Sequence, residues 1–262
     1  MKKISIIISL MVSLLFFVAL AQASPIGKIT GITGNADITP AGENQAKKLA
    51  AGDTVSTGDI VRTKSKSKAE IAFNDGNILR LAENTRLKIA EYMSGRDKKV
   101  SIISLLRGKI QNTVNTVGGE GGRYEVHTPT SVCGVRGTVF FNYHLNGVSG
   151  SLFEKGEGYG FNARMPQDIK TISAGHKMIV PGASEPAQLR PFTPGELKAL
   201  QMETDPSSGV FRSEESAGNA GRRLDQTLDQ YKPVPGDVKP YIPPPVHHEP
   251  HPPYPPQPPY PY

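Results

Sequence analysis

The sequence predicts an all-β domain followed by a disordered, proline-rich extension. Between Gly27 and Pro181, short runs of alternating apolar and polar residues are separated by Gly, Asn and Asp, and no apolar stripe of helical period is sustained. Of the 23 prolines, 14 lie in residues 233–262 and only 9 in the preceding 232 residues. Regular short strands favour a twisted sandwich or a solenoid-like coil, so these two arrangements are the expected folds.

The clearest strands contain apolar pairs that recur every eight residues, namely Ile71-x-Phe73, Leu79-x-Leu81 and Leu87-x-Ile89. Because successive side chains of a strand point to opposite faces, both members of each pair should face the core. Asp75-Gly76, between the first two pairs, supplies the positive φ angles of a two-residue hairpin turn. Further strands are expected at Val100–Leu106, Lys109–Val114, Tyr124–Thr128, Thr138–His144, Ser151–Glu154, Gly158–Asn162, Lys170–Ser173 and Lys177–Val180.

Residues 1–23 have the pattern of a cleavable signal peptide. Met1-Lys2-Lys3 precedes an apolar run that ends at Leu20, and Ala21-Gln22-Ala23 fits the small-x-small motif of signal peptidase. The alternative is an uncleaved anchor, because the 17 residues of the run can just span a bilayer. Cleavage leaves 28 basic against 24 acidic residues, a net charge of +4. This predicts a protein of the periplasm, or otherwise outside the cytoplasm, without a nucleic-acid partner.

Two segments follow the β domain, which we place at residues 24–182. Residues 183–232 are expected to be a linker with short helices, because Thr193-Pro194-Gly195-Glu196 resembles a capping box that opens a helix at Pro194–Glu203. Residues 233–262 form a Pro/Tyr-rich disordered tail of polyproline II character. The candidate partner-binding residues of this tail are Tyr254, Tyr260 and Tyr262, and a solvated spacer is the alternative.

Val132–Phe140 contains Val135-Arg136-Gly137-Thr138, and Ile172–Lys177 contains a turn at Gly175. With further blocks between residues 26 and 182, in the same order, they resemble the FecR domain family: Val132–Phe140 is similar to its "vRGT" signature and Ile172–Lys177 to its late glycine turn. The signature positions, for which structural or interaction roles are expected, are Gly52, Asp53, Gly58, Asp59, Arg62, Thr63, Asp75, Gly76, Gly108, Thr128, Pro129, Arg136, Gly137, Thr138 and Gly175.

The resemblance implies an extracytoplasmic, β-rich module. The best-known members of the family regulate iron uptake by sensing an outer-membrane transporter and controlling a sigma factor. In those regulators a cytoplasmic helical domain precedes a membrane span, whereas here only Met1-Lys2-Lys3 precedes the apolar run. We therefore expect a stand-alone exported member of binding or scaffolding type that lacks the sigma-regulating domain.

Two residues of the vRGT block have a functional and a structural interpretation. The guanidinium of Arg136 is expected to cap backbone carbonyls or pair with Glu125 or Asp75, and recognition of a partner's carboxylate is the alternative. Cys133 is the single cysteine, so no intramolecular disulfide can form. We expect it to be a small buried hydrophobe, with a mixed disulfide or covalent dimer as the alternative.

Catalysis and cofactor binding are not expected from this sequence. It contains no nucleophile elbow, HExxH motif or nucleotide-binding loop. The histidines of the β domain lack metal-ligand spacing, and its turn aspartates stand where a turn uses an Asx side chain for its own backbone. These residues are His127, His144, His176, Asp53, Asp59 and Asp75.

A basic run, Arg62-x-Lys64-x-Lys66-x-Lys68, places four cations on one face if it is extended. Binding of phosphate groups, polysaccharide or lipid head groups is its functional interpretation. The structural interpretation is a solvated loop or an edge strand that lysines protect from unwanted pairing, and we prefer it.

These features favour an exported, non-enzymatic module that binds a protein or another cell-envelope component, with the tail reaching that partner. The first alternative is a module that binds polysaccharide or peptidoglycan through its β face, with the cations of the basic run as its contacts. The second is a membrane-anchored signalling regulator, which requires the N-terminal segment to remain uncleaved; only then would the protein contact a membrane.

Overall fold

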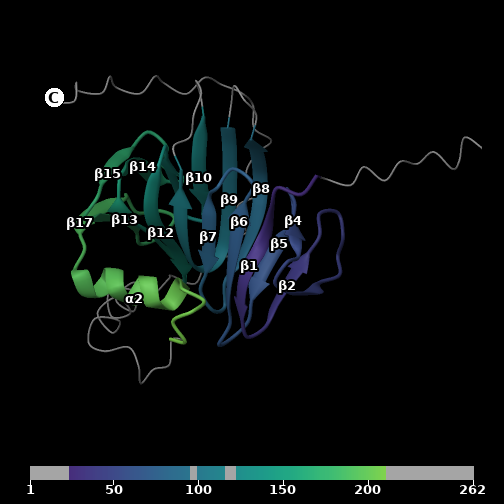
Figure 1. The fold of residues 1–262 in the computed structure, drawn as a ribbon. Helices are drawn as coiled ribbons and strands as arrows, with labels where there is room; N and C mark the ends of the chain where they lie inside the picture. Colours follow the sequence, from purple (N-terminus) through teal and green to yellow (C-terminus); the bar gives the residue numbers. More distant parts are fainter. Residues whose placement is uncertain (1–23, 95–98, 116–121, 211–262) are drawn as a thin grey trace, which may run out of the picture.

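The computed structural model describes residues 24–94, 99–115 and 122–210. Within these residues, seventeen strands are connected through hydrogen bonds, and one helix, α2 (Pro194–Thr204), follows them (Figure 1). The predicted signal segment and the Pro/Tyr tail, with Tyr254, Tyr260 and Tyr262, lie outside the described residues. No helix among the described residues is long and apolar enough to cross a membrane.

The strands form two sheets that share the long strand β9 (Lys99–Val114). Sheet 1 runs in the order β4 (Thr54–Val55), β1 (Gly27–Thr33), β6 (Lys68–Phe73), β7 (Ile78–Leu81), second half of β9, β12 (Thr138–Leu145), β13 (Val148–Lys155), β16 (His176–Val180) and β17 (Gln188–Pro191). Sheet 2 runs in the order β3 (Lys47–Leu49), β2 (Ala36–Thr39), β5 (Ile60–Thr63), β8 (Arg86–Ser94), first half of β9, β10 (Arg123–His127), β11 (Ser131–Val135), β14 (Glu157–Asn162) and β15 (Lys170–Ser173). The β9–β10 pairing is parallel and the other pairings are antiparallel.

The core lies between the two sheets, so the fold is a twisted sandwich. Ile71, Leu79 and Phe140 of sheet 1 belong to the same buried cluster as Leu87 and Ile103 of sheet 2. The apolar pairs predicted from the alternating pattern are all buried, as the period of two requires. The all-β prediction is confirmed. Of the two expected folds, the two-layer arrangement is the twisted sandwich and not the solenoid-like coil.

Strand β9 replaces two strands that we expected at Val100–Leu106 and Lys109–Val114. It continues through Gly108, whose φ of +101° is a conformation that glycine adopts without strain. A Cβ atom at Gly108 would lie 2.5 Å from the Cα of Thr85. Before this glycine β9 pairs with β8 and β10, and after it with β7 and β12, so the strand passes from sheet 2 into sheet 1.

The hairpin between β6 and β7 is one residue longer than the expected two-residue turn. The N–H of Phe73 donates to the carbonyl of Asn77 and the N–H of Gly76 donates to that of Phe73, which closes a three-residue loop. Gly76 has a φ of +83°, and Asp75 is not among the described residues with positive φ. A type I turn followed by a left-handed glycine therefore replaces the type I′ turn.

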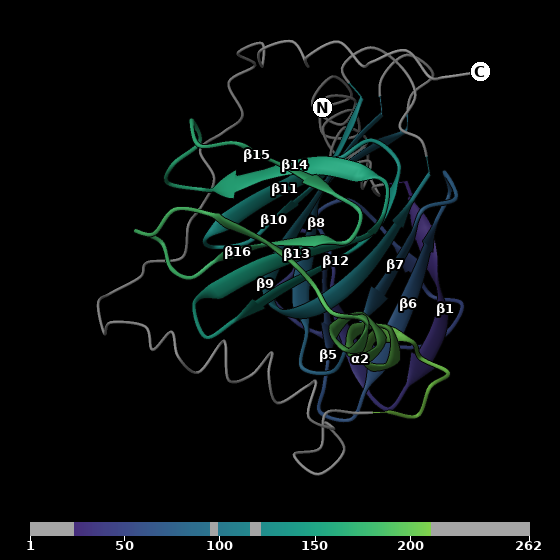
Figure 2. The same ribbon diagram turned by 90° about the vertical axis from the view of Figure 1, so that its left-hand side faces the viewer.

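Helix α2 begins with the predicted capping box. Thr193 accepts a hydrogen bond from the Glu196 N–H, and the Glu196 carboxylate accepts one from the Thr193 N–H. The helix packs on the outer face of sheet 1, where the fully buried Leu200 contacts Phe141 and Leu152. Figure 2 shows it end-on, outside the strands. The segment expected to be a linker thus contributes both this helix and β17 to the folded body.

Candidate functional site

The signature aspartates hold turns. Asp53 accepts a hydrogen bond from the N–H of Ala50 at 2.7 Å, and Asp59 accepts one from the N–H of Ser56 at 2.8 Å. Asp75 accepts bonds from the N–H of its neighbour Asn77 and, at 2.7 Å, from the Tyr92 hydroxyl. The interpretation of these aspartates as turn residues is confirmed by their contacts.

The signature threonines and glycines join neighbouring strands. The Thr63 hydroxyl donates to the Ala82 carbonyl, and the Thr138 hydroxyl donates to the Glu157 carbonyl. Thr128 accepts a bond from the N–H of Ser131 across the turn that contains Pro129. The signature glycines of the turns have positive φ angles, as turns without a Cβ penalty allow; they are Gly52, Gly58, Gly76 and Gly175.

Sheet 2 carries a pair of aromatic rings on its outer face, which we call the aromatic platform: Tyr159 and Phe161 of β14. Their ring centroids are 6.4 Å apart, their planes differ by 8°, and both residues are half-buried. The Tyr159 ring covers Gly134 of β11, because a Cβ atom there would lie 2.3 Å from the ring carbon Cζ. Gly134 therefore leaves the space that the Tyr159 ring occupies. The sequence alone did not indicate this role.

A buried carboxylate holds this platform in place. Glu125 of β10 accepts hydrogen bonds from the Tyr159 hydroxyl at 2.7 Å and from Nε2 of His127 at 2.7 Å, and Nε of Arg123 lies 3.4 Å away in an ion pair. Burial opposes ionisation, but the bonds from His127 and Tyr159 and the charge of Arg123 outweigh it and lower the pKa of Glu125. The carboxylate is fully engaged and acts as a fixed anchor for the ring.

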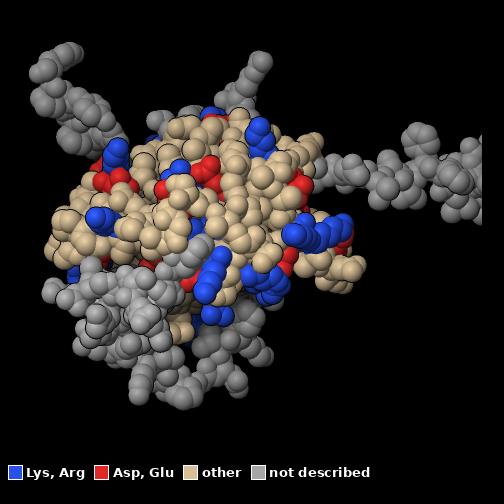
Figure 3. All heavy atoms as spheres, turned by 60° about the horizontal axis from the view of Figure 1, so that its bottom comes forward, with Lys and Arg blue, Asp and Glu red and all other residues tan. Residues whose placement is uncertain are grey.

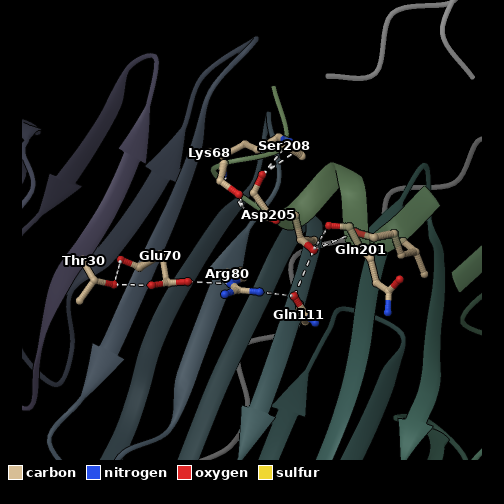
Figure 4. A network of polar contacts seen from close by, with 11 residues as sticks. Thr30, Lys68, Glu70, Arg80, Gln111, Gln201, Asp205 and Ser208 are labelled. Atoms are coloured by element: carbon tan, nitrogen blue, oxygen red, sulfur yellow. Dashed lines mark hydrogen bonds and ion pairs between the residues drawn. The ribbon is translucent and has the colours of Figure 1, made fainter. Parts of the chain in front are cut away.

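The basic run does not form one face. Lys68 is fully buried, and its Nζ donates to the carbonyls of Met202 and Asp205 at the C-terminal end of α2, where a cation is favourable (Figure 4). Burial lowers the pKa of Lys68, although neighbouring acids oppose this. Arg62 and Lys64 both bind Asp37. The single four-cation face of the functional interpretation does not form, because β5 and β6 lie in different sheets with a turn between them.

A polar row on sheet 1 continues toward the same helix. Thr30 donates to Glu70 at 2.7 Å, Arg80 pairs with Glu70 at 2.6 Å, and Arg80 also donates to Gln111 (Figure 4). The hydroxyl of Thr204 in α2 completes the row at Gln111. With the ion pairs Lys177–Glu196 and Lys109–Glu203, these contacts fix both ends of α2 to sheet 1.

Residues 59–153, from β5 to β13, match the profile of the FecR protein family. This segment of the chain is similar to a FecR domain. Two crystal structures of an anti-sigma factor candidate from Parabacteroides distasonis, at 1.65 and 2.50 Å resolution, are also similar, each with 15% identity and a TM-score of 0.45. The alignment covers 55% of this chain and 64% of theirs, so the chain spans less than two thirds of their length. No curated protein matches the sequence.

Within the described β domain, the signature residues do not converge on one pocket. Arg136 and Gly137 lie exposed in the turn between β11 and β12, whereas Arg62 lies on the outer face of sheet 2. The aromatic platform and its anchor Glu125 are separate from both. The aromatic platform could not be predicted from the sequence, because it depends on the pairing of β11 with β14. This pairing brings Gly134 opposite Tyr159.

The nucleophilic groups of the domain are enclosed. Cys133 is fully buried and burial raises the pKa of its thiol to about 12, so its expected role as a buried hydrophobe is confirmed. The Ser149 hydroxyl lies 2.8 Å from Nδ1 of His144, but Ser149 is fully buried and also bonded to Thr128 and Thr130. Burial lowers the pKa of His144 to about 4. The Cys133 thiol and the Ser149 hydroxyl are therefore both enclosed by packing.

Proposed function

We propose that this protein is an exported, non-enzymatic FecR-domain protein that acts as a protein-binding or scaffold module in the cell envelope. The observation that supports it best is the aromatic platform on sheet 2. Half-buried tyrosine and phenylalanine rings beside charged groups are typical anchors of protein–protein interfaces. Tyr159 is held at its hydroxyl by Glu125 and at its face by Gly134, so little side-chain entropy is lost when a partner binds.

The Pro/Tyr tail supplies a second contact in this proposal. Proline fixes the backbone in an extended form, and the interleaved tyrosines Tyr254, Tyr260 and Tyr262 offer aromatic faces to a groove. A second contact on the same chain raises the effective concentration of the first, so the two together bind more tightly than either alone.

The experiment is recovery of partners from an envelope extract with four proteins: the full mature chain, a truncation before Pro233, Phe161→Ala and Tyr159→Phe. Loss of a central anchor costs at least about tenfold in affinity, so Phe161→Ala should recover far less partner. Tyr159→Phe keeps the ring and should recover more than Phe161→Ala. If Phe161→Ala and the full chain recover equal amounts of partner, the aromatic platform is not a partner-binding site. If the truncation and the full chain recover the same partners, the tail is not a partner-binding site.

Polysaccharide or peptidoglycan binding is a second candidate function, and exposed cations on sheet 2 favour it. A membrane-anchored signalling regulator is the third, in keeping with the regulatory members of the FecR family. Sequencing the N-terminus of the native protein distinguishes this third candidate from the exported module. The anchored regulator begins at Met1, whereas the exported module begins at Ser24.

A further inference from the structure

Four exposed cations lie in register across five neighbouring strands of sheet 2. Lys48 of β3 is opposite Asp37 of β2, and Asp37 is opposite Arg62 of β5. Arg62 is opposite Arg86 of β8, and Arg86 is opposite Arg107 of β9, just before a shift in register between Arg86 and Leu87. Both Arg86 and Arg107 are exposed. Residues directly opposite one another project from the same face of a sheet. We call Lys48, Arg62, Arg86 and Arg107 the cationic row.

Positive charge exceeds negative charge along this row. Asp37 is the acid within it; its carboxylate receives two bonds from Arg62, at 3.0 and 2.7 Å, and lies 2.5 Å from Nζ of Lys64. Arg86 and Arg107 form no ion pair or side-chain hydrogen bond with the described part of the chain. Three further acids lie near the row: Glu83 and Glu203 line a cavity of about 90 Å³ together with Arg107, and Glu43 pairs with Lys47. Glu203 is itself paired with Lys109.

A shallow cleft continues the row at its β3 end. Its volume is about 450 Å³, and its charged lining residues are Lys47, Lys48, Lys64 and Asp37. Figure 3 shows blue Lys and Arg side chains gathered toward the right of the view, the side on which Figure 1 places β2 and β5. The cleft and the row together form one continuous basic track.

The row is unfavourable for folding. Like charges directly opposite on neighbouring strands destabilise a sheet, and the row has two such pairs in succession, Arg62–Arg86 and Arg86–Arg107. An acid at Arg86 would convert both repulsions into attractions. Packing therefore gives no reason for Arg86, whereas an anionic ligand along the row does.

We propose that the cationic row binds a linear acidic polysaccharide, with one carboxylate or phosphate group for each cation it meets. Neighbouring strands are about 4.8 Å apart, which is close to the length of one sugar unit in an extended chain. A row of cations that is one residue wide matches a linear polymer better than it matches the flat surface of a membrane. An extended peptide presents same-side carboxylates about 6.7 Å apart, which does not fit this spacing. The site is separate from the aromatic platform and does not depend on protein binding there.

The test compares binding of the full mature chain to polygalacturonate, neutral dextran and phosphatidylglycerol vesicles. The row variant is Arg86→Gln with Arg107→Gln, and the control is Lys155→Gln with Arg190→Gln, which removes the same charge from exposed positions outside the row. We expect binding to polygalacturonate that weakens with salt, falls about five- to thirtyfold in the row variant and is unchanged in the control. The row variant should also melt at an equal or higher temperature than the natural chain.

Four results would contradict the proposal. Equal losses in the row variant and the control show a non-specific charge effect. Absence of binding to polygalacturonate at low salt excludes the acidic polysaccharide. Row-dependent binding to the vesicles without binding to polygalacturonate assigns the surface to a membrane instead. A lower melting temperature of the row variant would show that the arginines stabilise the fold, which contradicts the reason given for the row.

Discussion

Replacing His144 with asparagine should flatten the pH dependence of stability between pH 4.5 and pH 6.5. His144 is buried at the end of β12, and Nδ1 of its ring contacts Ser149. Its pKa is about 4 in the folded protein, because burial disfavours the charged ring, against 6.5 for the exposed residue. Between these two values the unfolded chain binds a proton that the folded chain does not.

The sign follows from this difference in proton binding. Stability is unaffected by His144 above about pH 6.5, decreases as the pH falls from there to about 4, and is constant again below that. The difference between 6.5 and about 4 corresponds to a loss of about 3 kcal/mol over the full range, of which about 2 kcal/mol is reached at pH 5.

The assay is urea unfolding at several pH values for the natural chain, for His144→Asn and for a control, His176→Asn, at an exposed residue. Loss of packing lowers the stability of His144→Asn by the same amount at every pH. The test is therefore how the free energy of unfolding changes with pH, and not its absolute value. The free energy of unfolding should fall by about 2 kcal/mol less in His144→Asn than in the natural chain between pH 7.5 and pH 5. Parallel curves for the natural chain and His144→Asn would refute the reasoning.

Three further predictions concern packing. Gly134→Ala should lower stability by about 1–3 kcal/mol in thermal unfolding, because its Cβ would overlap the Tyr159 ring; an unchanged melting temperature would contradict that contact. Leu200→Ala should cost about 2–5 kcal/mol and speed amide hydrogen exchange in α2, whereas unchanged exchange would mean that the helix does not depend on this contact. Cys133 should react with a thiol reagent only as fast as the protein unfolds; rapid labelling of the native protein would contradict its burial.

Local patterns in the sequence predicted local structure well. The apolar pairs from Ile71 to Ile89 are buried because alternation is a property of each strand by itself. The capping box of Thr193 and Glu196 formed because its contacts span only three residues. The turn aspartates behave in the same way, since each bonds to the backbone of its own turn.

Predictions that depended on neighbouring strands were less successful. Lys68 was grouped with Arg62 because both stand in one basic run, but the chain turns between β5 and β6 and the two residues enter different sheets. The expected break before Lys109 is only a bend, because Gly108 lets β9 continue from one sheet into the other. The partners of Lys68, the carbonyls of Met202 and Asp205, also come from a distant part of the chain.

By itself the sequence determined that this is an all-β domain, which residues of each strand face its core, and that a FecR-like signature runs through it. The tertiary structure decided which strands are neighbours. That choice places Gly134 under Tyr159 and sets Arg62, Arg86 and Arg107 side by side. The physical reason is that alternation within a strand fixes a face but not a partner or a register, which depend on contacts between distant segments.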